Sequence, residues 1–144
     1  YLPIISLTCL RRQFNFMKIN VPASVGELFD KITILEIKKK KIKDKEKLKH
    51  VNAELNLLNK VVTKKKINKR KILKLINTLK SINLKLWNVE DKLRKLEKEK
   101  SFKSLFIQKA RSVYILNDKR SVMKNNINIE TNSNVNEVKS YEKY

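Results

Sequence analysis

The feature that most constrains this chain is an apolar seam just past its midpoint. Apolar side chains recur there in unbroken steps of three and four residues, at Ile72, Leu75, Leu79, Ile82, Leu86, Val89, Leu93 and Leu96. This is the a/d pattern of a coiled-coil helix, which presses one face against other helices along its whole length. Because each buried Leu or Ile contributes roughly 1.5–3 kcal/mol, the seam predicts a helical bundle.

The rest of the chain also favours helix. It contains one Gly and two Pro among 144 residues, so the usual signals of turns and strands are scarce. The length suits a single domain with one modest core. We therefore predict an all-α fold, an antiparallel bundle of four helices in which the third helix is long.

Two short signals mark the starts of the first two helices. Ser24 and Glu27 form an S-x-x-E capping box ahead of an apolar stripe. The first helix has apolar residues on two faces, so we expect it inside the bundle, with Glu27 and Asp30 partly buried. Asp44 is the expected N-cap of the second helix.

The two remaining helices are predicted from their apolar stripes. The third helix should run from about Ile67 to about Lys98, with its first half zipped against the second helix and its second half packed on the first and fourth. Ser101 or Ser104 is the expected N-cap of the fourth helix. Arg120 lies inside the apolar stripe of that helix, and the acids of the first helix are its natural partners.

Three regions are expected along the chain. Residues 1–16 read as an upstream or flexible extension, with a peripheral membrane anchor as the alternative. Residues 17–129 form the bundle, and residues 130–144 form a polar tail that is flexible or docks only through residues 138–141. No apolar stretch approaches the roughly 18–20 residues that span a bilayer, and a single cysteine fits a reducing cytoplasm.

Charge is the second strong feature of the sequence. The net charge is +21, and residues 38–85 carry +15 of it. Such a field attracts nucleic acid, anionic lipid or acidic proteins. However, 29 of the 35 basic residues are Lys, and Asn and Ile are also abundant, as an AT-rich coding sequence would produce without selection for binding. Arg, the residue preferred for bidentate contacts to phosphate and bases, is scarce.

A basic hairpin of the second and third helices is the candidate nucleic-acid surface. Its densest cations are Lys64, Lys65, Lys66, Lys69, Arg70, Lys71 and Lys74. Aromatic residues are absent from this segment, so stacking on bases is unsupported, and any binding would be non-specific. A solvated lysine-rich surface is the alternative interpretation.

Several motifs resemble a known family. They are VPASVGELFDKITILEIK at 21–38, LWNVEDKLRKLE at 86–97, FIQKARSVYILNDKRSVMKNNIN at 106–128 and EVKSY at 137–141. Together they resemble a family of short bacterial proteins classed as a domain of unknown function. The resemblance covers nearly all of residues 17–141 and implies no activity. The polar residues that it marks as special are Gly26, Glu27, Asp30, Lys31, Thr33, Glu36, Trp87, Glu90, Asp91, Arg111, Tyr114, Asn117, Asp118 and Arg120.

Most of this polar set forms the candidate binding site. Its members are Glu27, Asp30, Lys31, Glu36, Trp87, Glu90, Arg111, Tyr114, Asn117, Asp118 and Arg120. If the faces of the first, third and fourth helices meet, these side chains would line a charged cleft for a small anionic metabolite or a peptide. The alternative is a buried ion-pair network that fixes the register of the helices. No nucleophile with an adjacent base is visible, which favours the network.

These patterns favour a binding protein over an enzyme. One His and one Cys, His50 and Cys9, cannot build an ordinary structural zinc site, and we predict no metal and no cofactor. The leading expectation is a small cytoplasmic accessory module with an unknown protein partner or with self-association through its seam. A non-specific nucleic-acid binder and a bundle enzyme or metabolite binder are the alternatives.

Overall fold

The protein is all-α, as predicted. A computed structural model describes residues 19–135, 138 and 140, and contains four helices. They are α1 (Val25–Lys41), α2 (Lys45–Lys64), α3 (Leu73–Lys98) and α4 (Ser104–Glu130). None of these helices is both long enough and apolar enough to cross a membrane.

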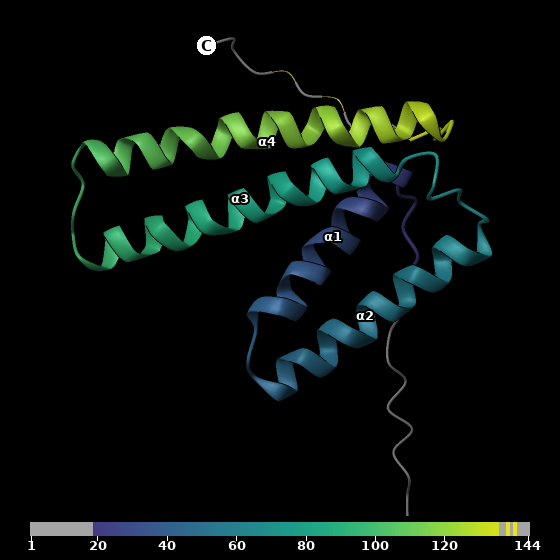
Figure 1. The fold of residues 1–144 in the computed structure, drawn as a ribbon, viewed down its shortest axis with the longest axis horizontal. Helices are drawn as coiled ribbons and strands as arrows, with labels where there is room; N and C mark the ends of the chain where they lie inside the picture. The colour runs from purple at the N-terminus through teal and green to yellow at the C-terminus, as the bar shows by residue number, and fades with distance from the viewer. Residues whose placement is uncertain (1–18, 136–137, 139, 141–144) are drawn as a thin grey trace, which may run out of the picture.

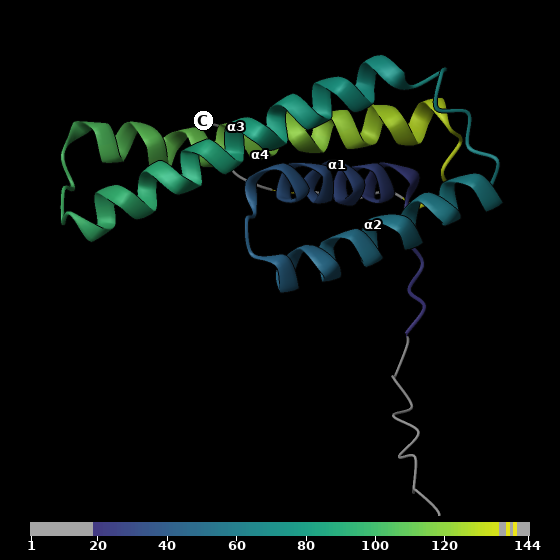
Figure 2. The ribbon, with the colours of Figure 1, turned by 60° about the horizontal axis from the view of Figure 1, so that its bottom comes forward.

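The helices are arranged in layers around α1. Helices α3 and α4 form a long antiparallel pair, α1 crosses beneath that pair, and α2 lies on the far side of α1 (Figures 1 and 2). Helix α1 contacts all three other helices, whereas α2 contacts α1 alone among the four. The expected central position of the first helix is therefore confirmed. The core follows from it, because Phe29, Ile32 and Leu35 of α1 are buried together with Leu79 of α3 and Ile127 of α4.

The predicted pairing of the second and third helices is wrong. No Cα atom of α2 comes within 8 Å of one in α3, and α3 instead packs along α4. The first half of α3 reaches α1 through Lys80 and Asn83, and Lys41 of α1 also donates to Asn88 Oδ1 in the second half, at 3.5 Å. The apolar stripe of α2, with Val51, Leu55 and Val62 buried, is covered by α1 and the shared core. Periodicity shows that a face is buried, but it does not show which helix covers it.

Helix α3 begins later than predicted, at Leu73 rather than at Ile67. Lys66 has a left-handed backbone, with φ of 52°, which ends α2 and turns the chain. The side chain of Asn68 then accepts hydrogen bonds from the backbone N–H groups of Arg70 and Lys71, at 3.1 and 3.4 Å. This side-chain turn competes with helix, so residues 67–71 form a connection.

The helix caps bear out two of the three predictions. The backbone N–H of Glu27 donates to Ser24 Oγ at 3.1 Å, and that of Lys47 donates to Asp44 Oδ1 at 2.9 Å. The predicted serine cap of the fourth helix is wrong. Helix α4 has Lys103 at its N-cap, without a side-chain hydrogen bond, because Ser104 is already the first helical residue.

The two ends of the bundle meet at the start of α1. The backbone N–H of Val25 donates to Ser133 Oγ at 3.2 Å. The C-terminal tail therefore contacts the bundle at Ser133, which precedes the residues, 138–141, that were predicted to make this contact. Val138 is exposed, and residue 141 lies outside the described residues, as does the predicted 1–16 extension.

Candidate functional site

A buried ion pair joins α1 to α4, as the sequence predicts. Arg120 Nε donates to Asp30 Oδ1 at 2.8 Å, and Arg120 Nη2 donates to Asp30 Oδ2 at 2.5 Å. Asp30 is 3% exposed. The planar guanidinium matches both carboxylate oxygens, which is the geometry that best offsets the desolvation of the two charges.

Helix α3 completes the surroundings of this pair. Asn83 Nδ2 donates to Asp30 Oδ1 at 2.9 Å and to Thr33 Oγ1 at 3.0 Å. The Thr33 hydroxyl in turn donates to the carbonyl of Asp30, one turn earlier, at 2.9 Å. Three helices thus share one buried polar network, and Asn83 is a member that the sequence motifs did not single out.

A second contact between α1 and α4 lies one turn away from this network. Lys124 Nζ lies 2.6 Å from Glu27 Oε1, and the Lys124 side chain is 10% exposed. The backbone N–H of Gly26 donates to Asn128 Oδ1 at 2.7 Å. A Cβ at residue 26 would lie 2.4 Å from the carbonyl oxygen of Lys124, so the two helices can approach this closely only with glycine there. We call Gly26, Glu27, Asp30, Thr33, Asn83, Asn117, Arg120, Lys124 and Asn128 the inner cluster.

The structure brings only part of the predicted site together. Of the eleven candidate binding residues, Glu27, Asp30, Asn117 and Arg120 fall in the inner cluster, where Arg120 Nη1 donates to Asn117 Oδ1 at 3.4 Å. Lys31 pairs instead with Glu54 of α2, 2.6 Å apart on the surface.

The other candidates lie on α1, α3 and α4 outside this cluster. Glu36 pairs with Lys80, while Glu90 pairs with Arg94 one turn along α3. Trp87 is half-buried beside the seam residue Leu86. Asp118 is half-buried on α4.

Arg111 and Tyr114 form a local pair on the outer half of α4. Arg111 Nε donates to the Tyr114 hydroxyl at 3.3 Å. This hydrogen bond, with the charge interaction that accompanies it, raises the pKa of the Arg111 guanidinium above its ordinary value. Arg111 precedes Arg120 by nine residues, or about 13 Å along the helix axis. The two arginines therefore act at separate places.

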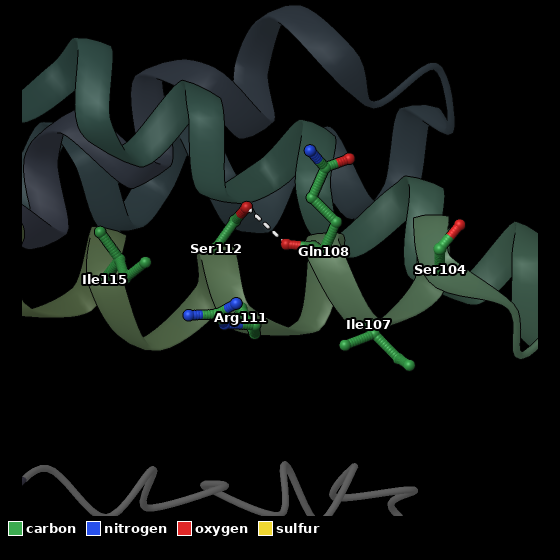
Figure 3. A pocket seen from close by; sticks show the side chains of 6 residues that line it. All are labelled: Ser104, Ile107, Gln108, Arg111, Ser112 and Ile115. Carbon is green, nitrogen blue, oxygen red and sulfur yellow. Dashed lines mark hydrogen bonds between the residues drawn. The ribbon is translucent and has the colours of Figure 1, made fainter. Parts of the chain in front are cut away.

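A groove that the sequence analysis missed runs along the hairpin of α3 and α4. Its first part is a depression of about 360 Å³ on α4, lined by Ser104, Ile107, Gln108, Arg111, Ser112 and Ile115 (Figure 3). A second depression, of about 370 Å³, lies between Lys85 and Val89 of α3 and Ile115 of α4. A third, of about 350 Å³, includes Ile82, Lys119 and Val122. All three share Ile115, and we call them together the outer groove.

The outer groove faces away from α1. Arg120 and Lys124 reach toward α1, and Val122 lies two residues from each of them, a rotation of about 200° around the helix. Ile107 and Val122 are 57% and 53% exposed. A second apolar row, Ile107, Ile115, Val122 and Ile129, repeats every seven or eight residues on α4, and this spacing is the sequence signal that could have found the groove.

The predicted nucleic-acid residues gather at one end of the molecule. All seven of these cations are exposed, at the end of α2, in the connection and in the first turn of α3. They surround a loop rather than a hairpin of two packed helices. Lys71 is tied to α4, because its Nζ lies 3.2 Å from Glu130 Oε2 and donates to the Glu130 carbonyl at 2.8 Å.

The described residues include no group of three His, Cys, Asp or Glu side chains that could hold a metal ion. His50 is exposed on α2, and Cys9 lies outside the described residues.

Residues 17–144 match a family of unknown function, DUF6165. The chain belongs to that family. The predicted membership of a family of unknown function is thereby confirmed, and the DUF6165 match takes in all four helices, the inner cluster and the outer groove. The chain matches no curated protein and no solved structure. Since the function of DUF6165 is unknown, membership assigns no role to these residues.

Proposed function

We propose that this protein is a binding module that holds an acidic amphipathic helix of another protein in the outer groove. The observation that carries the proposal is the row of exposed apolar side chains on α4, on the face turned away from α1. Ile107 and Val122 are more than half exposed and flank Ile115 in the same row. We take this row of exposed apolar side chains as a surface that a partner covers.

The size of the groove suits a helix. From Ser104 to Val122 it follows about 27 Å of α4, at about 1.5 Å per residue, which is the length of a helix of about 18 residues. Its walls are regular helix, so they supply no free strand edge for an extended peptide. An amphipathic helix laid in a groove between two helices is the recognition mode that fits.

The charge of the groove selects an acidic partner. The exposed cations Lys85, Arg111 and Lys119 line it, against one acid, Asp118, among the lining residues. Glutamates at the edge of a bound helix would meet these cations, whereas a basic helix would be repelled. A second copy of the chain, with its net charge of +21, meets the same repulsion.

The inner cluster supports a structural role instead of a ligand site. Asp30 forms an ion pair with Arg120, and Glu27 forms one with Lys124. The Asn83 amide donates hydrogen bonds to Asp30 and Thr33. Each of these bonds crosses between helices. We assign this network to holding α1 against α3 and α4, which keeps the outer groove straight.

A synthetic peptide tests the proposal. The probe is an 18-residue helix with Leu on one face and Glu elsewhere, and binding is followed by fluorescence anisotropy in 0.15 M salt. The double variant Ile107→Ser with Val122→Ser should bind at least about tenfold more weakly, because apolar area in the interface is lost. Both side chains are largely exposed, so the fold should be retained.

The matched control removes equal apolar surface elsewhere. Leu57→Ser with Leu73→Ser changes two residues that are also about half exposed but lie outside the groove. This control variant should bind the acidic peptide as tightly as the unchanged protein does. A second peptide, with Lys in place of every Glu, should bind neither the control variant nor the unchanged protein. Equal losses in both double variants, or no binding of the acidic peptide, would show that the groove is not a docking site for such helices.

A further inference from the structure

Positive charge is concentrated at one end of the molecule, in a segment of the chain that contains no acidic residue. Residues 55–89 contain ten Lys and Arg and no Asp or Glu. Eight of these cations gather at the end of α2, in the connection and at the start of α3; these are Lys60, Lys64, Lys65, Lys66, Lys69, Arg70, Lys71 and Lys74. We call them the basic end. Of the eight, Lys71 forms a salt bridge with an acid of the described residues, Glu130.

The fold turns this charge into a shaped surface. A depression of about 530 Å³ on the last turns of α2 is lined by Asn56, Asn59, Lys60, Thr63 and Lys64. The connection folds back toward it, because Lys69 Nζ donates to Asn59 Oδ1 at 3.5 Å. Amide and ammonium donors thus stand beside one another, as they do where proteins hold phosphate oxygens, while the Thr63 hydroxyl donates to the Asn59 carbonyl at 3.2 Å.

We propose that the basic end binds the phosphate backbone of double-stranded nucleic acid. A duplex carries one negative charge per about 1.7 Å, a dense array of phosphates that a cluster of lysines can meet. Lysine acts on phosphate as a point charge, so the scarcity of Arg lowers sequence specificity without lowering this attraction. The binding surface is distinct from the outer groove and independent of it.

The duplex is favoured over single strands by the absence of stacking groups. The sequence has no aromatic residue between Phe29 and Trp87, and Trp87 lies about 20 Å along α3 from Lys74. Proteins that bind single strands combine basic grooves with aromatic side chains on which bases stack. Because the basic end offers cations and amides but no aromatic side chains, it is suited to contact the phosphates of a duplex, whose bases are already paired.

The test uses a labelled 20-base-pair DNA duplex and the full chain, with anisotropy measured between 0.05 and 0.2 M salt. In the first variant Lys64, Lys65, Lys69 and Arg70 are each changed to Gln. We expect its log–log salt slope to be shallower by about 3 to 4, since each phosphate contact contributes about 0.9. Its affinity at 0.1 M salt should fall at least about tenfold.

The matched control removes the same charge at the opposite end of the molecule. Lys95, Lys98, Lys100 and Lys103, exposed at the turn between α3 and α4, are each changed to Gln (Figure 1). This control should keep the slope of the unchanged protein to within about one. Circular dichroism of both variants checks that the helices are retained.

Other results would overturn the proposal. Equal losses in both variants would show that the net charge acts as a whole and that the basic end is no site. Tighter binding of a single-stranded 20-mer would exclude the duplex preference. The protein could also bind poly-glutamate or phosphatidylserine vesicles as tightly as the duplex, and lose that binding in the first variant. That result would show that the basic end binds polyanions in general.

Discussion

Arg120 occupies a position in α4 where the apolar stripe calls for a hydrophobic residue. Leu116 and Met123 precede and follow it in that stripe, and its guanidinium is held by both oxygens of Asp30. The Asp30 side chain is 4% exposed and that of Arg120 is 28% exposed. If Arg120 is removed, water therefore cannot reach the Asp30 carboxylate to replace it.

We expect Arg120→Ala to destabilise the protein by about 3–5 kcal/mol, because it leaves the Asp30 charge buried without its counter-ion. Urea denaturation followed by circular dichroism gives the free energy of unfolding. Arg94→Ala is the control, since it breaks the exposed pair of Arg94 with Glu90. An exposed pair contributes about 0–1 kcal/mol. Similar small losses in both variants would contradict a structural role for the inner cluster.

Helices α3 and α4 both begin without a side-chain cap, and the start of α4 already has the backbone of an N-cap. Helices α1 and α2 begin with a Ser or Asp side chain that accepts a backbone hydrogen bond, whereas α4 begins after Lys103 without one. A cation there also faces the positive end of the helix dipole. The backbone of Lys103 is extended, with φ of −79° and ψ of −170°, which is the conformation of an N-cap.

Lys103→Ser should therefore stabilise the protein relative to Lys103→Ala, by about 0.5–2 kcal/mol. Both variants remove the same charge, and Ser alone supplies an acceptor for the first turn of α4. Thermal unfolding of the two variants side by side measures the difference. If the two variants unfold at the same temperature, a side-chain cap at residue 103 does not stabilise the protein, and the first turn of α4 is frayed.

The whole molecule is held together through α1. That helix has α2 on one side and the pair of α3 and α4 on the other, and α2 contacts none of the described helices besides α1 (Figure 2). An element with one neighbour can detach at a lower free energy than the element that joins all the others. Helix α2 is thus the part of the bundle most easily opened.

Hydrogen exchange followed by mass spectrometry should show this order. Peptides from the middle of α2 should exchange at least about tenfold faster than those from the middle of α1, a difference of about 1.4 kcal/mol in opening free energy. Peptides from the loop at 65–71 give the fast reference. Equal protection of α1 and α2 would instead mean that the bundle opens as a single cooperative unit.

The helices and one long-range contact could be predicted from the sequence. The steps of three and four from Ile72 to Leu96, with the caps at Ser24 and Asp44, predicted where helices lie, because capping and periodicity depend on neighbours along the chain. The pair of Arg120 with an acid of the first helix was also predictable. A cation in an apolar stripe needs a partner, and among the acids of that helix Asp30 is the buried one.

Which helix faces meet could be read only from the three-dimensional arrangement. The pairing of α3 with α4, the isolation of α2 and the outer groove all depend on which of several apolar faces come together, and one-dimensional patterns leave that choice open. The same holds for Asn83, whose place beside Asp30 depends on how α3 crosses α1. It holds also for Lys69, because only the turn at Asn68 brings it back onto α2. Local interactions fix each helix, whereas the competition among buried faces fixes their arrangement.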